Sequence, residues 1–351
     1  MRFRPTLLVL LSLFAVLPRA MAESTPQIRK GTAEFVPGSE EASVPKFFQM
    51  DRHKFDFEQK QLKTTSTTMR TSLLTFPSPV VTPHPKNNTV HCEYFCPTSP
   101  SKKPGVIVLH ILGGDFDLAR LFARSLANKG VAALFLKMPY YGERKQDDVD
   151  VQMISMDPHQ TVRGMRQAVL DIRQAASWLA AQDEVDPDQL GIMGVSLGGI
   201  TAALTASVEP RFHRVCLLLA GGSMGEVAWT STEMAELRDK WTAGGGTKES
   251  LFEIIKPVDP VTYAKPLASR KILMLNASHD EVVPPACTES LWHAFGEPEI
   301  VWWDAGHYTA AKYIITGMGK VTGFFAPANA KAASASKATG DSQAGAQTTA
   351  K

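Results

Sequence analysis

Residues 190–199 read LGIMGVSLGG, an apolar run that ends in a Gly-x-Ser-x-Gly motif and passes directly into a helix-like segment. A serine on so sharp a strand-to-helix turn is held in a strained conformation, and its neighbours must lack bulk for strand and helix to approach. Gly194, Gly198 and Gly199 meet that need. Short motifs of this kind also occur by chance, so a tight structural turn is the alternative. The flanks favour the functional reading, and we predict that Ser196 is a nucleophile.

The sequence around this motif alternates short apolar runs with longer amphipathic segments. Continuous apolar strands that alternate with helices predict a mostly parallel sheet covered by helices on both faces. Two earlier runs, TSLLTF and TVHCEYF, are expected to be antiparallel leading strands, and residues 222–266 to form a small insertion above the sheet. The strands are expected at 105–111, 131–139, 190–195, 215–221, 271–278 and 299–306, and the helices at 117–130, after Asp157, from about 197, around 284–295 and from about 308 to 325.

The two ends of the chain differ in composition from its centre. Residues 1–22 carry Arg2 and Arg4, an apolar run and small residues before a cleavage site, which indicates an export signal. The run of 11 apolar residues is too short for the alternative, a membrane anchor. Residues 23–50 are expected to be a linker or loosely packed arm, residues 51–326 one catalytic domain, and residues 327–351 a disordered low-complexity tail. We therefore expect an exported protein, secreted or periplasmic, without stable membrane insertion after cleavage.

Charge and cysteine content exclude several classes of protein. The formal charge is +2, and removal of the signal with its three arginines brings it to −1, so nothing calls for nucleic acid as a partner. Four cysteines are too few and too scattered for a disulfide scaffold in a domain of this size. Metal-ligand spacing is absent from the sequence, and no metal or cofactor is expected.

A serine hydroxyl becomes a good nucleophile only when an oriented base takes its proton. Among nine histidines, His307 follows the last expected strand and lies at the carboxyl edge of the sheet, where Ser196 also lies. Asp280 follows the strand at 271–278 and reaches the same edge, whereas Glu281 is expected to point elsewhere and Asp304 belongs to the loop of His307 itself. We predict Ser196, His307 and Asp280 as nucleophile, base and acid. The alternatives are a solvated loop histidine and a helix-capping aspartate.

The order Ser, Asp, His, each after a successive strand, resembles that of the α/β-hydrolases. The motifs that carry the resemblance are LHILGG at 109–114, GVSLGG at 194–199, NASHDEVVP at 276–284 and DAGH at 304–307. Within that superfamily the chain is most similar to the esterase and dienelactone-hydrolase-like branch. The resemblance implies an α/β-hydrolase fold with an eight-stranded type of sheet. Dienelactone hydrolases proper use a cysteine nucleophile where this chain has Ser196, so lactone specificity does not carry over.

The resemblance also implies an oxyanion hole made of two backbone amides. One should come from Leu197, the residue after the nucleophile. The other should come from the loop after His110, where Ile111 stands in place of the family's usual glycine, which favours Leu112 as the donor and leaves Ile111 as the alternative. Tyr140 and Tyr141 follow the next strand at the same edge, and are expected either to line a substrate pocket or to pack under the insertion.

Together these features predict a serine hydrolase that cleaves a small-molecule carboxylic ester through an acyl-enzyme on Ser196, with a preference for short acyl chains. A serine peptidase of the same fold and a catalytically silent binding protein are the alternatives. Of the two Asn-x-Ser/Thr patterns, at Asn87 and Asn276, only Asn87 is a candidate to carry a glycan, and only in a suitable host, because Asn276 ends a buried strand.

Overall fold

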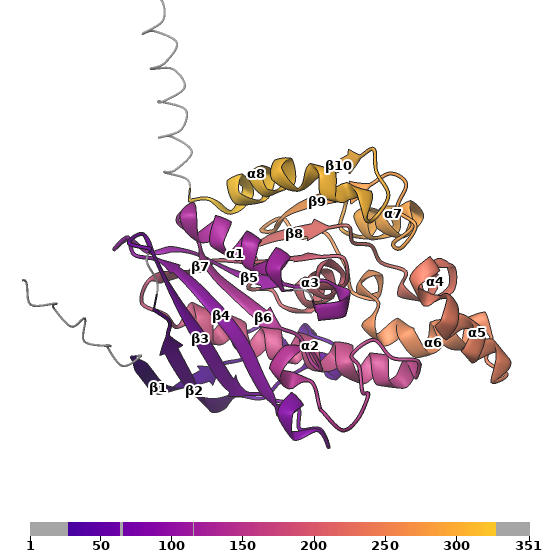
Figure 1. The fold of residues 1–351 in the computed structure, drawn as a ribbon, viewed down its shortest axis with the longest axis horizontal. Coiled ribbons are helices and arrows are strands. Elements are labelled where there is room, and N and C mark those ends of the chain that lie inside the picture. Colours follow the sequence, from indigo (N-terminus) through magenta and orange to yellow (C-terminus); the bar gives the residue numbers. More distant parts are fainter. Residues whose placement is uncertain (1–26, 64–65, 115, 328–351) are drawn as a thin grey trace, which may run out of the picture.

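The structure is a computed structural model that describes residues 27–63, 66–114 and 116–327. The predicted export signal (1–22) and the predicted tail, apart from its first residue, lie outside the described residues. One sheet of ten strands crosses the described part, in the order β1-β2-β3-β4-β6-β5-β7-β8-β9-β10 (Figure 1). The strands from β5 to β10 are parallel to one another, and those from β1 to β4 are antiparallel.

The strands lie where the apolar runs predicted them, and the sheet has the mostly parallel α/β-hydrolase arrangement. Those in the middle of the sheet are buried on both faces, which is why their sequences are continuously apolar. Two strands, β1 and β2, extend the expected eight. The bounds are β1 (Ile28–Phe35), β2 (His53–Gln61), β3 (Met69–Pro77), β4 (Thr89–Pro97), β5 (Lys103–Leu109), β6 (Ala132–Lys137), β7 (Val185–Val195), β8 (Arg214–Leu218), β9 (Lys271–Ala277) and β10 (Glu299–Trp303).

Helices cover both faces of the sheet, as predicted (Figure 1). On one face α1 (Asp117–Asn128) and α8 (Ile314–Phe325) share an apolar core with the strands, through side chains such as Phe122 and Phe325. On the other face α2 (Pro158–Ala180), α3 (Leu197–Val208) and α7 (Pro285–Ala294) contribute to a second core. The helix start predicted at Asp157 is present, since its side chain accepts a hydrogen bond from the His159 amide at 2.9 Å.

The predicted insertion lies between β8 and β9 and contains the helices α4 (Met224–Thr230), α5 (Ala235–Ala243) and α6 (Lys248–Ile255). In Figure 1 these helices gather at one end of the molecule, beside the near end of α2. Because β8 ends at Leu218, the insertion leaves the sheet at the carboxyl edge of the parallel strands, where Ser196 follows β7.

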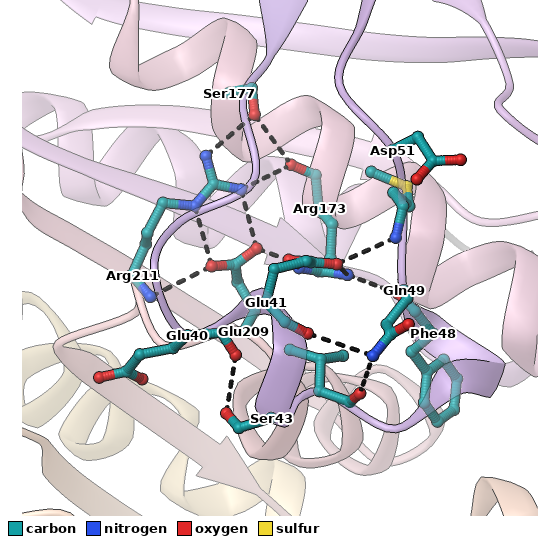
Figure 2. A network of polar contacts seen from close by, with 12 residues as sticks. Glu40, Glu41, Ser43, Phe48, Gln49, Asp51, Arg173, Ser177, Glu209 and Arg211 are labelled. Atoms are coloured by element: carbon teal, nitrogen blue, oxygen red, sulfur yellow. Dashed lines mark hydrogen bonds and ion pairs between the residues drawn. The ribbon is translucent and has the colours of Figure 1, made fainter.

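The expectation of a loosely packed arm over residues 23–50 is wrong for its described part. Residues of β1 pair along the whole of β2, and Phe35 and Phe48 are fully buried. Figure 2 shows how the segment is fastened: buried Arg173 of α2 donates to Glu41 at 3.0 Å and to Glu209 at 3.1 Å. The partners come from three distant parts of the chain, so a local pattern around residue 40 does not reveal the attachment.

All four cysteines are buried and free. Within residues 27–63, 66–114 and 116–327, no helix has both the length and the apolar character that a membrane span requires.

Candidate active site

Ser196 occupies the turn between β7 and α3 with φ 53° and ψ −119°, a backbone conformation that residues with a side chain rarely adopt. The surrounding glycines make this turn possible. A Cβ on Gly194 would lie 2.2 Å from the carbonyl carbon of Gly198, and one on Gly198 would lie 2.5 Å from the carbonyl oxygen of His110. Strand, turn and helix therefore approach as closely as the sequence motif indicated.

The structure brings Ser196, His307 and Asp280 together, although they are far apart in sequence. The Ser196 Oγ atom lies 3.0 Å from His307 Nε2, and His307 Nδ1 lies 2.9 and 2.8 Å from the two carboxylate oxygens of Asp280. The side chains of His307 and Asp280 are 9% and 2% exposed, so little water competes for these hydrogen bonds. The Asp280 carboxylate accepts the proton on Nδ1, which leaves the Nε2 lone pair facing the serine hydroxyl.

Asp280 is fixed by the backbone of its own loop. Its Oδ1 atom accepts hydrogen bonds from the amides of Val282 at 2.9 Å and Val283 at 2.7 Å. A carboxylate held by two amides and an imidazole has one orientation only, and it is aimed at His307.

The two acids that sequence reasoning set aside have other partners. Asp304 lies on the surface, where it contacts His279 at 3.0 Å with both side chains largely exposed. The Oε2 atom of Glu281 accepts the backbone amide of His307 at 3.0 Å. Sequence reasoning missed this second contact with the histidine loop, and no local pattern signals it.

The predicted oxyanion donors flank Ser196. Leu197 is the first residue of α3, so its N–H has no partner within the helix. Leu112 begins the turn η4 (Leu112–Gly114), in which Gly113 and Gly114 have φ of 85° and 77°. Leu112, Ser196 and Leu197 line the same cavity.

His110 does not line the cavity and instead anchors the segment that leads to Leu112. Its Nε2 atom accepts the Met138 amide at 3.1 Å, so the proton is on Nδ1, which donates to the Ile111 carbonyl at 2.7 Å. Burial lowers the pKa of His110 to about 4, and the neighbouring Lys137 and Arg144 act in the same direction. His110 is therefore neutral at physiological pH and ties the end of β5 to the end of β6.

Tyr140 and Tyr141 do not line the cavity of Ser196 but a larger one beside it. Tyr140 has φ 68°, and its amide donates to Asn87 Oδ1 at 2.9 Å. The Tyr141 ring packs against His110, with ring centroids 4.7 Å apart, and burial raises the pKa of its hydroxyl to about 12. The structure thus combines the two alternatives for this pair: both residues are packed inside, and both face a cavity.

Asn87, the candidate glycosylation site, is not accessible in the folded protein. Its side chain is fully buried, and its Nδ2 atom donates to Gln167 at 2.8 Å while Oδ1 accepts the Tyr140 amide. The asparagine holds the loop that carries the two tyrosines.

The cavity at Ser196 has a volume of about 80 Å³ and lies under the insertion. Apart from Ser196 itself, Thr161 and Ser231, its walls are apolar. They comprise Leu112, Ile154, Pro158, Leu197, Ile200, Met224, Val227, Ala228, Met234, Leu237, Leu251, Ile255, Val282 and Val283. Nowhere in the described part of the chain do three or more His, Cys, Asp or Glu side chains gather in a way that could hold a metal ion.

Two family models match the chain. The model of the prolyl oligopeptidase family matches residues 164–299, and that of the dienelactone hydrolase family matches residues 91–221. Among curated proteins, two uncharacterized Mycobacterium tuberculosis proteins, MT2702 and Rv2627c, are each 29% identical over 215 residues, which cover 59% of this chain and 50% of theirs. The chain therefore spans about half the length of the curated relatives it matches.

Two solved structures with a similar fold are acetyl xylan esterases. That of Thermoanaerobacterium sp. JW/SL YS485 superposes with a TM-score of 0.58 at 21% identity, over 75% of this chain and 86% of that one. That of Paenibacillus sp. R4 superposes with a TM-score of 0.59 at 16% identity, over 80% and 99%. Family models, similar structures and sheet order agree: the chain has an α/β-hydrolase fold and resembles the serine esterases and dienelactone hydrolases.

Proposed function

We propose that this protein is a serine hydrolase of carboxylic esters, with Ser196 as nucleophile, His307 as general base and Asp280 as the acid that orients it. The observation that carries the proposal is the continuous hydrogen-bonded chain from Ser196 Oγ through both nitrogens of His307 to Asp280. A strained serine at the start of a helix, next to a cavity, adds to it.

The reaction follows from this geometry. Ser196 Oγ attacks the ester carbonyl carbon while His307 Nε2 takes the hydroxyl proton, and Asp280 stabilises the imidazolium that forms. The amides of Leu197 and Leu112 are the donors for the oxyanion. The bond to the alcohol then breaks and the alcohol leaves with the proton from Nε2. Water attacks the acyl-enzyme with His307 again as base, and the acid is released.

The size of the Ser196 cavity supports a preference for short acyl chains. A water-sized group needs roughly 10–15 Å³ of such space, and the cavity offers about 80 Å³. The cavity therefore has room for about half a dozen water-sized groups, such as methylene groups, in mostly apolar surroundings. Acyl chains beyond roughly six carbons would have to displace the insertion helices.

Turnover of p-nitrophenyl esters with graded acyl length tests the proposal. We expect rates to be highest for short chains and to fall beyond about six carbons, and Ser196→Ala to reduce turnover about 10⁴-fold or more. A fluorophosphonate probe should label the wild type and not Ser196→Ala. If the folded wild type were neither labelled nor active, a catalytically silent binding protein would replace the proposal.

A serine peptidase is the second candidate, because the prolyl oligopeptidase family model matches residues 164–299. The same three side chains would then attack an amide. Parallel assays on p-nitroanilides and p-nitrophenyl esters of one acyl group separate the two. We expect the ratio of kcat/KM for the ester to kcat/KM for the anilide to exceed the ratio of their uncatalysed hydrolysis rates. A ratio below that of the uncatalysed reactions would favour the peptidase.

We also propose that residues 1–22 are a cleaved export signal and that the enzyme acts outside the cytoplasm, either secreted or in the periplasm. N-terminal sequencing of the protein recovered from outside the cytoplasm tests this, with a mature start near Glu23 expected.

A further inference from the structure

A second, larger cavity adjoins the one at Ser196. Its volume is about 550 Å³, roughly seven times the 80 Å³ of the first. The two share Leu112, Ile154, Met234 and Leu237 in their walls, so they meet at the oxyanion loop and under the insertion. The first is named the serine cavity here and the second the tyrosine cavity, after Tyr140 and Tyr141 in its wall.

The walls of the two cavities differ in chemistry. Nearly every side chain around the serine cavity is apolar. The tyrosine cavity has polar side chains on several sides, among them Tyr141, Lys145, Asp150, Gln152, Glu233 and Glu236. A hydrocarbon chain gains most from the first cavity, and a group that carries several hydroxyls finds donors and acceptors only in the second.

We infer that the tyrosine cavity binds the alcohol half of the ester, and that this alcohol is uncharged, bears several hydroxyl groups and is larger than the acyl group. The inference rests on the proposed function. The acyl carbons stay bonded to Ser196 Oγ through the acyl-enzyme stage, so they must occupy the cavity that Ser196 itself lines. The alcohol departs after the first step, when its oxygen takes the proton from His307, and a neighbouring, wider cavity suits it.

Charge decides against an anionic alcohol. Three carboxylates line the tyrosine cavity, those of Asp150, Glu233 and Glu236, against one ammonium group, that of Lys145. Glu236 is paired with Lys240, and Glu233 accepts a hydrogen bond from the Tyr308 hydroxyl at 2.5 Å. The balance remains negative, so a carboxylate or phosphate on the alcohol would be repelled while neutral hydroxyl groups would not.

Three acetate esters test the inference in the wild type through released acetate: ethyl acetate, 6-O-acetylglucose and 6-O-acetylgluconate. The acyl group is constant, so only the alcohol varies. We expect kcat/KM for 6-O-acetylglucose to exceed that for ethyl acetate at least tenfold, mainly through KM. For the anionic gluconate ester we expect kcat/KM to be roughly twofold lower than for the glucose ester, as repulsion by about one net charge at roughly 8 Å in water predicts.

Cavity-filling variants then locate the effect. Val151 is half-buried in the wall of the tyrosine cavity, and Val151→Trp should lower the ratio of kcat/KM for 6-O-acetylglucose over ethyl acetate tenfold or more. Ala228→Leu narrows the serine cavity and should lower kcat/KM for ethyl butyrate relative to ethyl acetate, with the glucose ratio within twofold of wild type. Val81→Trp, at an 85% exposed position that lines neither cavity, is the control for an added tryptophan.

The outcomes separate this inference from the function on which it rests. If the wild type hydrolyses no ester, or does so without Ser196, both fall. If ethyl acetate is cleaved in a Ser196-dependent way but 6-O-acetylglucose has no advantage, only the inference falls. The inference is also overturned if Val151→Trp changes the acyl preference and Ala228→Leu changes the alcohol preference. That result would mean that the tyrosine cavity binds the acyl group and the serine cavity the alcohol. Equal thermal midpoints of wild type and variants show that each variant is folded.

Discussion

The neutral His110 at the end of β5 gives the fold a specific dependence on pH. Burial lowers the pKa of His110 from the usual 6.5 to about 4. Between pH 6.5 and pH 4, His110 is therefore protonated in the unfolded chain and neutral in the folded chain. The stability that comes from keeping His110 neutral is fully present above pH 6.5, and it is lost as the pH falls toward 4. Over the whole pH range, this shift in the pKa of His110 changes the free energy of unfolding by ~3 kcal/mol.

Replacing His110 by glutamine isolates this contribution. A glutamine amide oxygen can still accept the Met138 amide, which the structure gives to His110 Nε2, but the side chain no longer titrates. Integration of the two titrations between pH 7.5 and 5.0 predicts that the wild type loses ~2 kcal/mol more than His110→Gln over that interval. Other titrating groups contribute equally to both proteins and cancel in the comparison.

Urea unfolding followed by circular dichroism at pH 7.5 and pH 5.0 measures the difference. His159→Gln, which removes an exposed histidine near the start of α2, is the matched control and should follow the wild type. An equal loss of unfolding free energy in wild type and His110→Gln would refute the reasoning, because it would mean that folded His110 accepts a proton as readily as the unfolded one.

Three further substitutions test the packing and the hydrogen bonds around the site. Gly198→Ala should destabilise the fold by about 2–3 kcal/mol, since its Cβ would lie 2.5 Å from a backbone carbonyl oxygen; an unchanged Tm would contradict this. Glu281→Ala should lower kcat about tenfold with little change in KM, because the His307 amide loses its acceptor. Glu281→Gln keeps an acceptor oxygen and should retain most of the activity, so an equal loss in both variants would show that the hydrogen bond is not the cause. Arg173→Leu should cost about 3–5 kcal/mol in urea unfolding at pH 7, because it removes a partner from the buried Glu209. Burial tends to raise the pKa of Glu209, but its arginine partners bring the pKa below the usual 4.5. The ionised carboxylate therefore stabilises the fold fully above pH 4.5, and this stabilisation is lost as the pH falls through the lowered pKa. The wild type should accordingly lose stability more steeply below pH 4.5 than Arg173→Leu does.

The parallel core of the fold could be predicted because its physical cause is local. A strand buried on both faces needs an unbroken run of apolar residues, and the runs that become β5, β6, β8 and β9 are of that kind. The predicted start of the last helix, at about residue 308, is too early. Residues 309–313 form a separate 3-10 turn, η9, and α8 begins at Ile314.

The edge of the sheet could not be predicted in the same way. Residues 28–35 read IRKGTAEF, with only Ala33 and Phe35 buried, and no apolar period marks a strand. The segment is ordered by pairing with β2 and by the ion pairs that Arg173 makes with Glu41 and Glu209. These partners lie 132 and 36 residues from Arg173, and sequence spacing carries no information about such contacts.

The positions of Ser196, Asp280 and His307 could be predicted for a topological reason. Each follows a parallel strand, and the carboxyl ends of such strands meet at one edge whatever the loops between them do. The three side chains accordingly lie within hydrogen-bond distance in the structure. What surrounds them depends instead on the insertion, and the placement of its helices follows from contacts that only the folded chain reveals.

The insertion also contacts the loops that carry Asp280 and His307, so a change in the substrate cavities can also affect the position of these two residues. Met234 and Leu237 belong to the walls of both cavities, so residues of the insertion govern the size of each. Glu233, next to them, accepts the hydroxyl of Tyr308, which directly follows His307 in the chain. A change that moves this turn to admit a larger substrate therefore also pulls on the loop that holds the base. Ala228 of α4 lines the serine cavity and not the tyrosine cavity, which makes it the better place to alter acyl preference without changing the walls of the second cavity.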